Sequence, residues 1–191
     1  MRIILASTSP RRAEILRQAE IQFEVVAPGV EENHGDGEPP LELVRRLAAE
    51  KANAVAARIH DPAIVVAADT LVLMEGKVYG KPTTPEHAAE MFRHYSGRAH
   101  EVLTGLAVLR LPEKTLRVEH ETTRVTFAAM SEEEIAAYIA TGEPFDKAGA
   151  YAIQGIGGRY VARIDGCYFN VMGLPLARLY RMLREMGWKE E

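Results

Sequence analysis

Ionisable side chains stand in this sequence at points where strands and helices are expected to begin or end. The most informative acid is Asp69, which with Thr70 directly follows the apolar run at residues 63–68. A carboxylate at the carboxyl end of a buried strand lies where open α/β sheets bind their ligands. Asp69 could hold a divalent metal ion or accept a proton from water. A turn or capping role is the alternative that spacing alone leaves open.

The segment from Ser7 to Arg12 reads Ser-Thr-Ser-Pro-Arg-Arg and follows a short apolar strand. Ser9 before Pro10 is typical of an N-cap and a first helical position. Helix N-termini present free N–H groups, and Arg11 and Arg12 add forked donors that suit phosphate oxygens. The segment therefore predicts a phosphate site, or else an ordinary cap with solvated arginines.

Lys51 lies four residues from both Leu47 and Val55, so it shares the apolar face of a helix expected over residues 40–59. A lysine on such a face either extends its ammonium group to water or directs it at an anion. Spacing alone does not choose between these two interpretations.

Two further segments carry basic or amide side chains. Lys81 stands between Gly80 and Pro82, in a rigid turn. Residues 146–155 are rich in small side chains and carry Lys147 and Gln154. The Gln154 amide has both donors and an acceptor, so it could read the edge of a base.

Glu31 and Glu32 lie in the Gly-, Pro- and acid-rich segment 28–40, the loosest part of the chain. They could supply further oxygen ligands to a metal ion, or they could be solvated loop charges. Taken together, at least four basic side chains, one strand-end carboxylate and one amide suit a nucleotide with several phosphates and a metal ion.

The spacing of residues argues against three other kinds of site: a P-loop, a zincin zinc site and a dinucleotide-binding loop. Residues 76–82 contain two glycines and a lysine, but the glycine gap is three and Pro82 follows Lys81, so a P-loop is excluded. His100-Glu101 and His120-Glu121 lack the second histidine of a zincin helix. Residues 155–158 lack the glycine spacing of a dinucleotide fingerprint.

Composition bounds the remaining classes. The 191 residues are 47% hydrophobic and 26% charged, which is ordinary for a globular protein and predicts one domain, or two closely packed lobes. The net charge of −4 gives no global attraction to nucleic acid or to an anionic membrane. The single cysteine permits no internal disulfide. The apolar runs are too short for a membrane span, and the residues after Met1 become polar too soon for a secretory signal, so we expect a cytoplasmic protein.

Hydrophobic periodicity and cap signals predict alternating strands and helices, hence an α/β fold with a mixed sheet and not a clean doubly wound one. The predicted strands are residues 3–6, 23–26, 63–68, 71–73, 78–79, 101–111 and 116–129. The predicted helices are residues 10–19, 40–59, 85–95 and 132–139, the last capped by Ser131 with Glu134, and a final helix from about Pro175.

The ordered set of motifs resembles the Maf family of nucleoside triphosphate pyrophosphatases. The resembling segments are residues 7–12, 31–32, 50–52, 67–70, 80–82, 96–97 with 100–102, 146–151 with 153–155, and 173–175. Each is weak alone, but their order along almost the whole chain is specific. Arg11-Arg12, Asp69-Thr70 and Ile153-Gln154 look like the dTTP/UTP branch and not like the 7-methyl-GTP branch.

The resemblance implies hydrolysis of a nucleoside triphosphate to its monophosphate and pyrophosphate, by metal-assisted attack of water on the α-phosphate. It also implies an elongated central sheet flanked by helices around a nucleotide cleft, related to the inosine triphosphate pyrophosphatase fold. A homodimer and a divalent cation, Mg²⁺ first and Mn²⁺ as the alternative, are expected as well. A non-catalytic nucleotide-sensing regulator of cell division is the alternative function.

The resemblance assigns a role to each candidate residue. Asp69 matches the catalytic position and, with Glu31 and Glu32, the metal-binding acids. Positions linked to substrate choice are Arg11, Thr70 and Gln154. Phosphate-binding positions are Ser7, Ser9, Arg12, Lys51, Lys81 and Lys147.

Overall fold

A computed structural model describes residues 1–33 and 37–190 of the chain, so part of the loose segment 28–40 lies outside the described residues. The α-helices are α1 (Pro10–Gln18), α2 (Pro40–Ala56), α3 (Pro85–Tyr95), α4 (Glu132–Ala140), α5 (Tyr168–Val171) and α6 (Leu176–Glu185). The strands are β1 (Ile3–Leu5), β2 (Phe23–Val25), β3 (Ala63–Met74), β4 (Lys77–Tyr79), β5 (Ala99–Leu111), β6 (Thr115–Phe127) and β7 (Val161–Asp165). Short 3₁₀ helices cover Glu143–Asp146, Ala148–Ala150 and Ile156–Tyr160.

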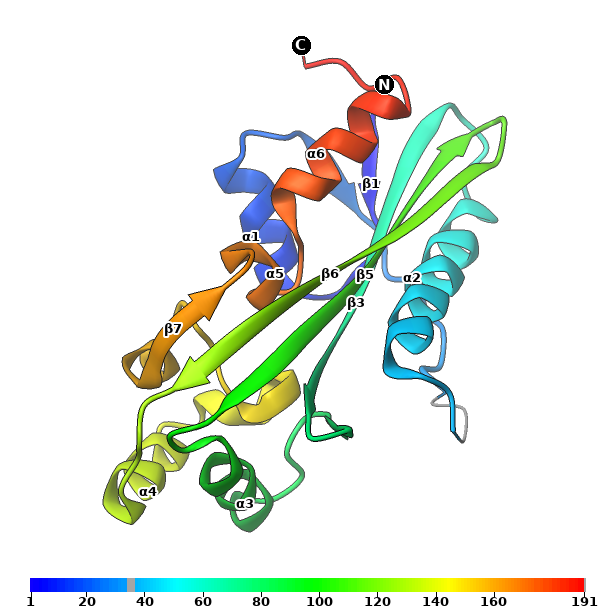
Figure 1. The fold of residues 1–191 in the computed structure, drawn as a ribbon. Coiled ribbons are helices and arrows are strands. Elements are labelled where there is room, and N and C mark those ends of the chain that lie inside the picture. Colours follow the sequence, from blue (N-terminus) through cyan, green and yellow to red (C-terminus); the bar gives the residue numbers. More distant parts are fainter. Residues whose placement is uncertain (34–36, 191) are drawn as a thin grey trace. The chain divides into compact units, whose positions relative to one another are not determined.

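The strands form a mixed sheet, as the sequence predicts (Figure 1). Among the described residues it has seven strands, in the order β2-β1-β3-β5-β6-β7, with β4 paired to β3. β1 pairs in parallel with both β2 and β3, whereas β3–β4 and β6–β7 are antiparallel pairs. The parallel pairs join strands that are separated by helices along the chain, whereas the antiparallel pair β3–β4 joins strands that follow each other directly.

The chain divides into two compact units, which are described separately. Unit 1 comprises Met1–Asp69, Thr104–Glu121 and Gly173–Glu191, and unit 2 comprises Thr70–Leu103 and Thr122–Met172. Strands β3, β5 and β6 contribute residues to both units. In the described part of the chain, no helix is long and apolar enough to cross a bilayer.

In unit 1, helix α2 covers one face of the sheet (Figure 1). Its buried side chains Ala48, Ala52 and Val55 belong to one hydrophobic cluster with inward residues of β1, β3 and β5. The strand members of that cluster are Ile4, Ala63, Val65, Ala67, Ala107, Leu109 and Leu111, and Ala6 directly after β1 also belongs to it. Many of these are alanines, so the helix backbone can lie close to the strands.

Gly105 on β5 is the point of closest approach. A Cβ atom built there would lie 2.1 Å from the carbonyl oxygen of Val44 and 2.7 Å from the backbone nitrogen of Arg45. Backbone atoms cannot swing aside as a flexible side chain can. Only glycine therefore fits at this crossing of β5 and α2.

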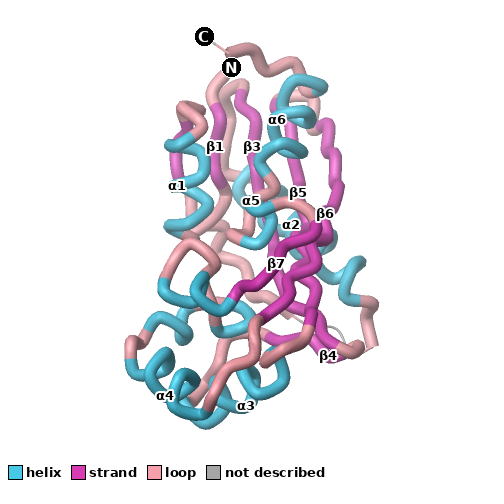
Figure 2. The backbone as a smooth tube through the Cα atoms, turned by 60° about the vertical axis from the view of Figure 1, so that its left-hand side comes forward, coloured by secondary structure: helices cyan, strands magenta, loops and turns pink. Residues whose placement is uncertain are grey.

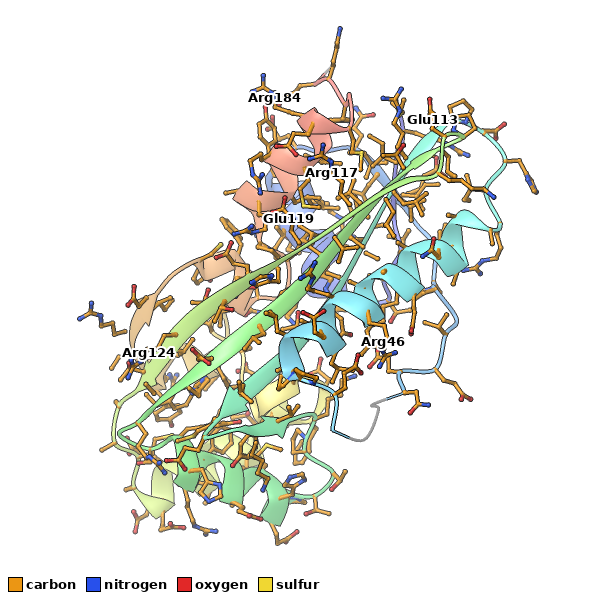
Figure 3. The ribbon with its side chains drawn as sticks, turned by 45° about the vertical axis from the view of Figure 1, so that its right-hand side comes forward. Arg46, Glu113, Arg117, Glu119, Arg124 and Arg184 are labelled. Carbon is orange, nitrogen blue, oxygen red and sulfur yellow. The ribbon has the colours of Figure 1, made fainter. Side chains whose placement is uncertain are left out.

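Helices α1 and α6 lie on the other side of the unit 1 strands from α2 (Figure 1). Ile15 and Leu16 of α1 are fully buried, and so are Leu179 and Leu183 of α6. Ion pairs join α6 to β6. Arg178 contacts Glu119 at 2.6 Å and Arg117 contacts Glu185 at 2.6 Å; Arg117 and Glu119 are labelled in Figure 3.

Unit 2 has an aromatic core. Helices α3 and α4 lie side by side (Figure 2). The centroids of their Phe92 and Tyr138 rings are 5.2 Å apart. His100 is 2% exposed, and its Nε2 lies 2.8 Å from the Tyr151 hydroxyl. Burial lowers the pKa of His100 to about 4, so the ring is neutral at pH 7.

Most predicted elements are confirmed within two residues, but some boundaries are wrong. The largest error concerns strand 63–68, which continues through Asp69 and Thr70 to Met74 because residues 72–74 pair with β4. Helix α2 ends at Ala56 and not at Ile59. Strand β7, helix α5 and the 3₁₀ helices were not predicted, because such short elements have too few residues to show a hydrophobic period.

We expect Gly105→Ala to destabilise unit 1 by about 1–3 kcal/mol, because the methyl group forces α2 away from the sheet. The matched control is Gly80→Ala, whose added Cβ has nothing within 4 Å. Denaturant unfolding of both variants measures the difference. Equal stability of the two would contradict the close approach of α2 and β5.

Candidate functional site

Asp69 faces helix α2. Successive side chains of a strand point to opposite faces, and Ala63, Val65 and Ala67 of β3 pack against α2. Asp69 continues that alternation and is 8% exposed. The expectation that Asp69 follows the end of a strand is wrong, because Asp69 lies inside β3. It nevertheless lies near the carboxyl end of β1, since Leu5 is in register with Val66.

Lys51 meets Asp69 from α2. Lys51 is 6% exposed, and its Nζ donates a hydrogen bond of 2.6 Å to Asp69 Oδ1. The sequence left open whether this lysine extends to water or points at an anion, and the structure confirms the anion. The reason is that Ala48, Ala52 and Val55 fix this face of α2 against the sheet.

Glu32 is the second acid at this ammonium group. Lys51 Nζ donates to Glu32 Oε1 at 2.6 Å, and the Glu32 side chain is 53% exposed. Glu31 is also exposed, and its carbonyl oxygen accepts a hydrogen bond from the Asn33 N–H. Lys51 thus connects an acid in the core to an acid at the surface.

Ser7 and Arg12 form the neighbouring part of unit 1. Arg12 Nη1 donates to Ser7 Oγ at 3.2 Å, and Arg12 Nε donates to the Gly173 carbonyl at 2.8 Å. Ser9 is the N-cap residue of α1, as predicted, and Pro10 follows it. Its side chain makes no capping bond, however, and its N–H instead donates to Ser7 Oγ at 3.1 Å.

The charges of this region influence one another. The pKa of Arg12 is lowered overall, mainly because burial disfavours its charged form. The nearby Arg11 also lowers this pKa, whereas the acids Asp69 and Glu32 raise it. Arginine stays protonated throughout the physiological range. Arg12 and Lys51 therefore place two cations of unit 1 within the field of the Asp69 carboxylate.

A donor set for a divalent cation is present in part. The carboxylates of Glu32 and Asp69 converge on one nitrogen atom, each at 2.6 Å. Mg²⁺ is commonly held by one or two carboxylates, with water and phosphate oxygens completing its octahedron, so this pair of acids fits such an ion. Within residues 1–33 and 37–190, no cluster of three or more His, Cys, Asp or Glu side chains is suited to a metal ion.

Arg11 is half-buried in the first turn of α1, and unit 2 contains the other predicted residues. The turn that bears Lys81 is tied to the Lys147 segment, because Gly149 N–H donates to the Gly80 carbonyl at 2.9 Å. Lys81 and Gln154 are exposed. The Lys147 ammonium group is held by its own loop, donating to the Glu143 carbonyl at 2.8 Å and to Asp146. Thr70 begins unit 2 and is half-buried.

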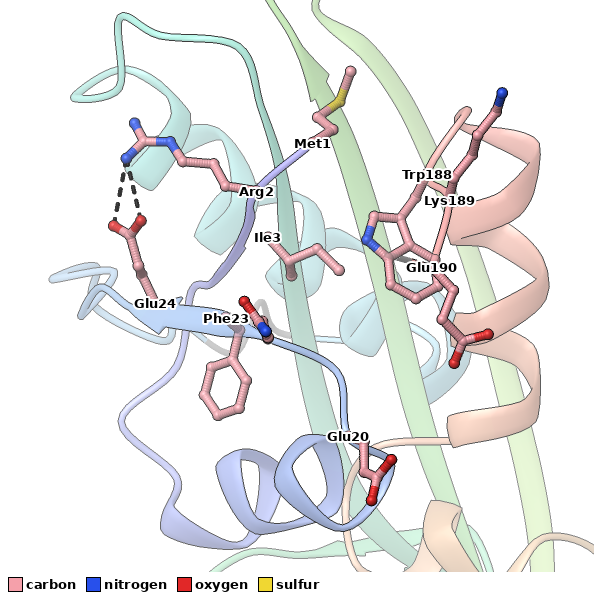
Figure 4. A pocket seen from close by; sticks show the side chains of 10 residues that line it. Met1, Arg2, Ile3, Glu20, Phe23, Glu24, Trp188, Lys189 and Glu190 are labelled. Atoms are coloured by element: carbon pink, nitrogen blue, oxygen red, sulfur yellow. Dashed lines mark hydrogen bonds and ion pairs between the residues drawn. The ribbon is translucent and has the colours of Figure 1, made fainter.

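A cavity of about 350 Å³ in unit 1 is a different feature (Figure 4). It lies at the amino end of β1, where Arg2 pairs with Glu24 and Trp188 covers one side. Its lining includes acids and bases but none of the predicted site residues. The Asp69 region lies beyond the carboxyl end of the same strand.

Gly173 has a role in positioning Arg12 that the sequence does not predict. Its carbonyl fixes Arg12 across a separation of 161 residues, and its φ of +104° is rarely adopted by other residues. The Gly-Leu-Pro motif before α6 is a signal for this turn, but nothing in the local sequence indicates which side chain its carbonyl accepts from.

We expect Lys51→Met to cost about 3–5 kcal/mol of folding stability, because it leaves the buried Asp69 carboxylate without its ammonium partner. Adding Asp69→Asn should recover part of that loss. The matched control on α2 is Arg46→Met; Arg46 is labelled in Figure 3. Its acidic partners Glu38 and Glu50 are both more accessible to water than Asp69, so the loss should be smaller. Urea unfolding of the wild type, Lys51→Met, Asp69→Asn, the double variant and Arg46→Met tests the pairing, and additive effects of the Lys51 and Asp69 changes would contradict it.

Comparisons with known proteins agree with this architecture. The structure is similar to the Staphylococcus aureus Ham1 protein, with a TM-score of 0.50 at 13% identity over 97% of this chain and 99% of that one. It is also similar to a HAM1 protein from Coxiella burnetii, with a TM-score of 0.51 at 14% identity over 97% and 99%. At these identities the likeness concerns the fold alone.

Proteins found by sequence comparison are much more similar to this chain in sequence than these two structures are. A dTTP/UTP pyrophosphatase of Carboxydothermus hydrogenoformans is 50% identical over 98% of this chain and 100% of its own length. A dTTP/UTP pyrophosphatase of Koribacter versatilis is 52% identical over 98% and 95%. The model of the family described as Maf-like protein matches residues 2–186. The chain belongs to the Maf-like protein family.

Proposed function

We propose that this protein hydrolyses dTTP and UTP, releasing the nucleoside monophosphate and pyrophosphate. The observation that carries the proposal is the buried Lys51–Asp69 ion pair, with Glu32 and Arg12 beside it. Relatives that are 50–52% identical over nearly their whole length bear the name dTTP/UTP pyrophosphatase. Modified pyrimidine nucleotides are further candidate substrates.

The proposed chemistry is attack of water on the α-phosphorus. Asp69 holds or deprotonates the water, and the bond from the α-phosphorus to the bridging oxygen breaks as pyrophosphate leaves. Lys51 and Arg12 neutralise charge on the phosphate oxygens, and Lys81, Lys147, Ser7 and Ser9 are proposed as further phosphate contacts. Positioned charges carry most of the catalysis in phosphoryl transfer, so one missing cation has a large effect.

A divalent cation, Mg²⁺ in the first instance and Mn²⁺ as an alternative, belongs to the proposal. Bound with the substrate, such an ion would supply Lewis-acid polarisation of phosphate oxygens and a lower pKa for a bound water. Asp69 and Glu32 are the proposed protein ligands, because their carboxylates already converge. Glu31 is the neighbouring alternative to Glu32.

Substrate choice is assigned to Arg11, Thr70 and Gln154. A site built to hydrogen-bond one base edge rejects a base that leaves its buried polar groups unpaired. The homodimer, the absence of a nucleic-acid or membrane partner and the cytoplasmic location remain predictions from the sequence.

We expect Asp69→Asn to bind nucleotide but to turn over at least about a hundredfold more slowly, because the base and metal ligand is lost. The matched control is Asp61→Asn, an aspartate of unit 1 whose side chain is 82% exposed. Steady-state release of pyrophosphate from dTTP with Mg²⁺ is the measurement. Near-normal turnover of Asp69→Asn would remove Asp69 from this role.

The products of the wild-type reaction decide between the candidate functions. Monophosphate and pyrophosphate support the proposal, whereas diphosphate and orthophosphate indicate another hydrolase. Binding of dTTP without hydrolysis favours the nucleotide-sensing regulator.

We expect Gln154→Ala to flatten the preference among dTTP, UTP and GTP, because the exposed amide that would read the base edge is removed. The ratio of kcat/KM values for dTTP and GTP measures the preference. An unchanged ratio would place the base reader elsewhere.

A further inference from the structure

The glycine-rich segment 155–158 wraps around a carboxylate of its own chain. Glu143 Oε2 accepts a hydrogen bond of 2.9 Å from the Ile156 N–H, and Glu143 Oε1 accepts one of 3.0 Å from the Gly157 N–H. The Tyr138 hydroxyl donates a third bond, of 2.7 Å, to Oε1. Successive backbone N–H groups at a turn form an anion-binding concavity. Here the bound anion is internal.

The glycines are there because side chains would not fit. A Cβ at Gly155 would lie 2.3 Å from Glu143 Oε2, and one at Gly157 would lie 2.4 Å from the Tyr138 hydroxyl. This explains why the segment resembles a dinucleotide fingerprint without having its spacing. The glycines leave room for the Glu143 carboxylate and the Tyr138 hydroxyl, where those of a dinucleotide fingerprint would leave room for a pyrophosphate.

Helix α4 and the turn after it hold Glu143 in place. Gly142 adopts a φ of +76°, and its N–H donates to the Ile139 carbonyl at 3.0 Å. Glu143 N–H donates to Thr141 Oγ1 at 3.2 Å. Tyr138, which is 1% exposed, also accepts a bond of 3.3 Å from the Ala152 N–H. The carboxylate is therefore anchored to the core of unit 2.

The charge of Glu143 strengthens the anchor. Burial raises the pKa of its carboxyl group, but the Gly157 N–H, the Tyr138 hydroxyl and the Ile156 N–H outweigh that effect, and the pKa is lowered overall. The carboxylate is ionised at neutral pH. Hydrogen bonds to an ionised acceptor are shorter and stronger than neutral ones.

Gln154 stands between the anchored points. It lies two residues after Ala152, whose N–H contacts Tyr138, and two residues before Ile156, whose N–H contacts Glu143. Gln154 itself is exposed, and so is its neighbour Gly155. Without the anchor, a segment with three glycines would have many backbone conformations open to it.

We propose that Glu143 is a positioning residue, which fixes the backbone around Gln154 so that the Gln154 amide meets the base in one orientation. The inference rests on the proposed function, because it concerns the discrimination among nucleotides. Glu143 touches no substrate in this proposal and acts only through Gln154.

A double-mutant cycle on substrate preference tests the proposal. Glu143→Gln removes the charge and turns an amide N–H₂ group toward the backbone donors. We expect it to lower the dTTP-to-GTP ratio of kcat/KM roughly fivefold, about the effect of one misplaced hydrogen bond. In the Gln154→Ala background the same change should have no further effect on the ratio, because the reader is absent.

Controls separate positioning from general stability. Glu132→Gln removes an exposed carboxylate of α4 that pairs with Arg93, and it should leave the ratio unchanged. Tyr138→Phe removes one of the three donors while keeping the ring, and we expect a smaller change in the ratio. It replaces Glu143→Gln in the cycle if that variant does not fold.

Amide hydrogen exchange gives a readout that does not depend on activity. The Ile156 and Gly157 amides should exchange slowly in the wild type and faster in Glu143→Gln. If wild-type protein releases no pyrophosphate, the proposed function fails and the assignment to base reading fails with it, whereas exchange still reports the anchor. If the wild type is active, an unchanged ratio in Glu143→Gln, or equal effects with and without Gln154, overturns the inference.

Discussion

The buried ion pair between Lys51 and Asp69 is the constraint on which the candidate site depends. Both residues are more than nine-tenths buried, and a charge in that position is tolerated only with an opposite charge in direct contact. Such a pair contributes little net stability compared with apolar side chains of similar volume. Its presence in a core otherwise made of aliphatic side chains therefore points to a chemical role.

The packing of unit 1 determines that the pair can form. Helix α2 approaches the sheet closely because its contact residues are small and because β5 has Gly105 at the crossing. Lys51 then reaches Asp69 of β3, Glu32 contacts the same ammonium group, and Arg12 lies within the field of the Asp69 carboxylate. Four groups from four separate segments share one electrostatic environment, which a flexible surface cluster would not maintain against water.

Unit 2 uses the same physics in a different way. There the carboxylate of Glu143 is bound by backbone N–H groups and a tyrosine hydroxyl, and not by a lysine. The buried acid of unit 1 faces the charged ends of a lysine and an arginine, whereas the acid of unit 2 is bound by neutral donors of the backbone and of a tyrosine. The first arrangement is suited to chemistry and the second to holding a loop in place.

The sequence alone determined the mixed α/β class, most helices and strands, the family and the residue types of the candidate site, because these follow from periodicity, capping and the order of motifs. It also indicated that Lys51 shares the apolar face of its helix, but not what its ammonium group contacts. Only the tertiary structure decided that Asp69 lies inside β3 and that Lys51 bonds both Asp69 and Glu32. It also decided that the Gly173 carbonyl holds Arg12 and that Glu143 holds the loop at 155–158. The reason is that hydrogen bonds between residues far apart in the chain leave no local pattern, since they depend on how the elements pack.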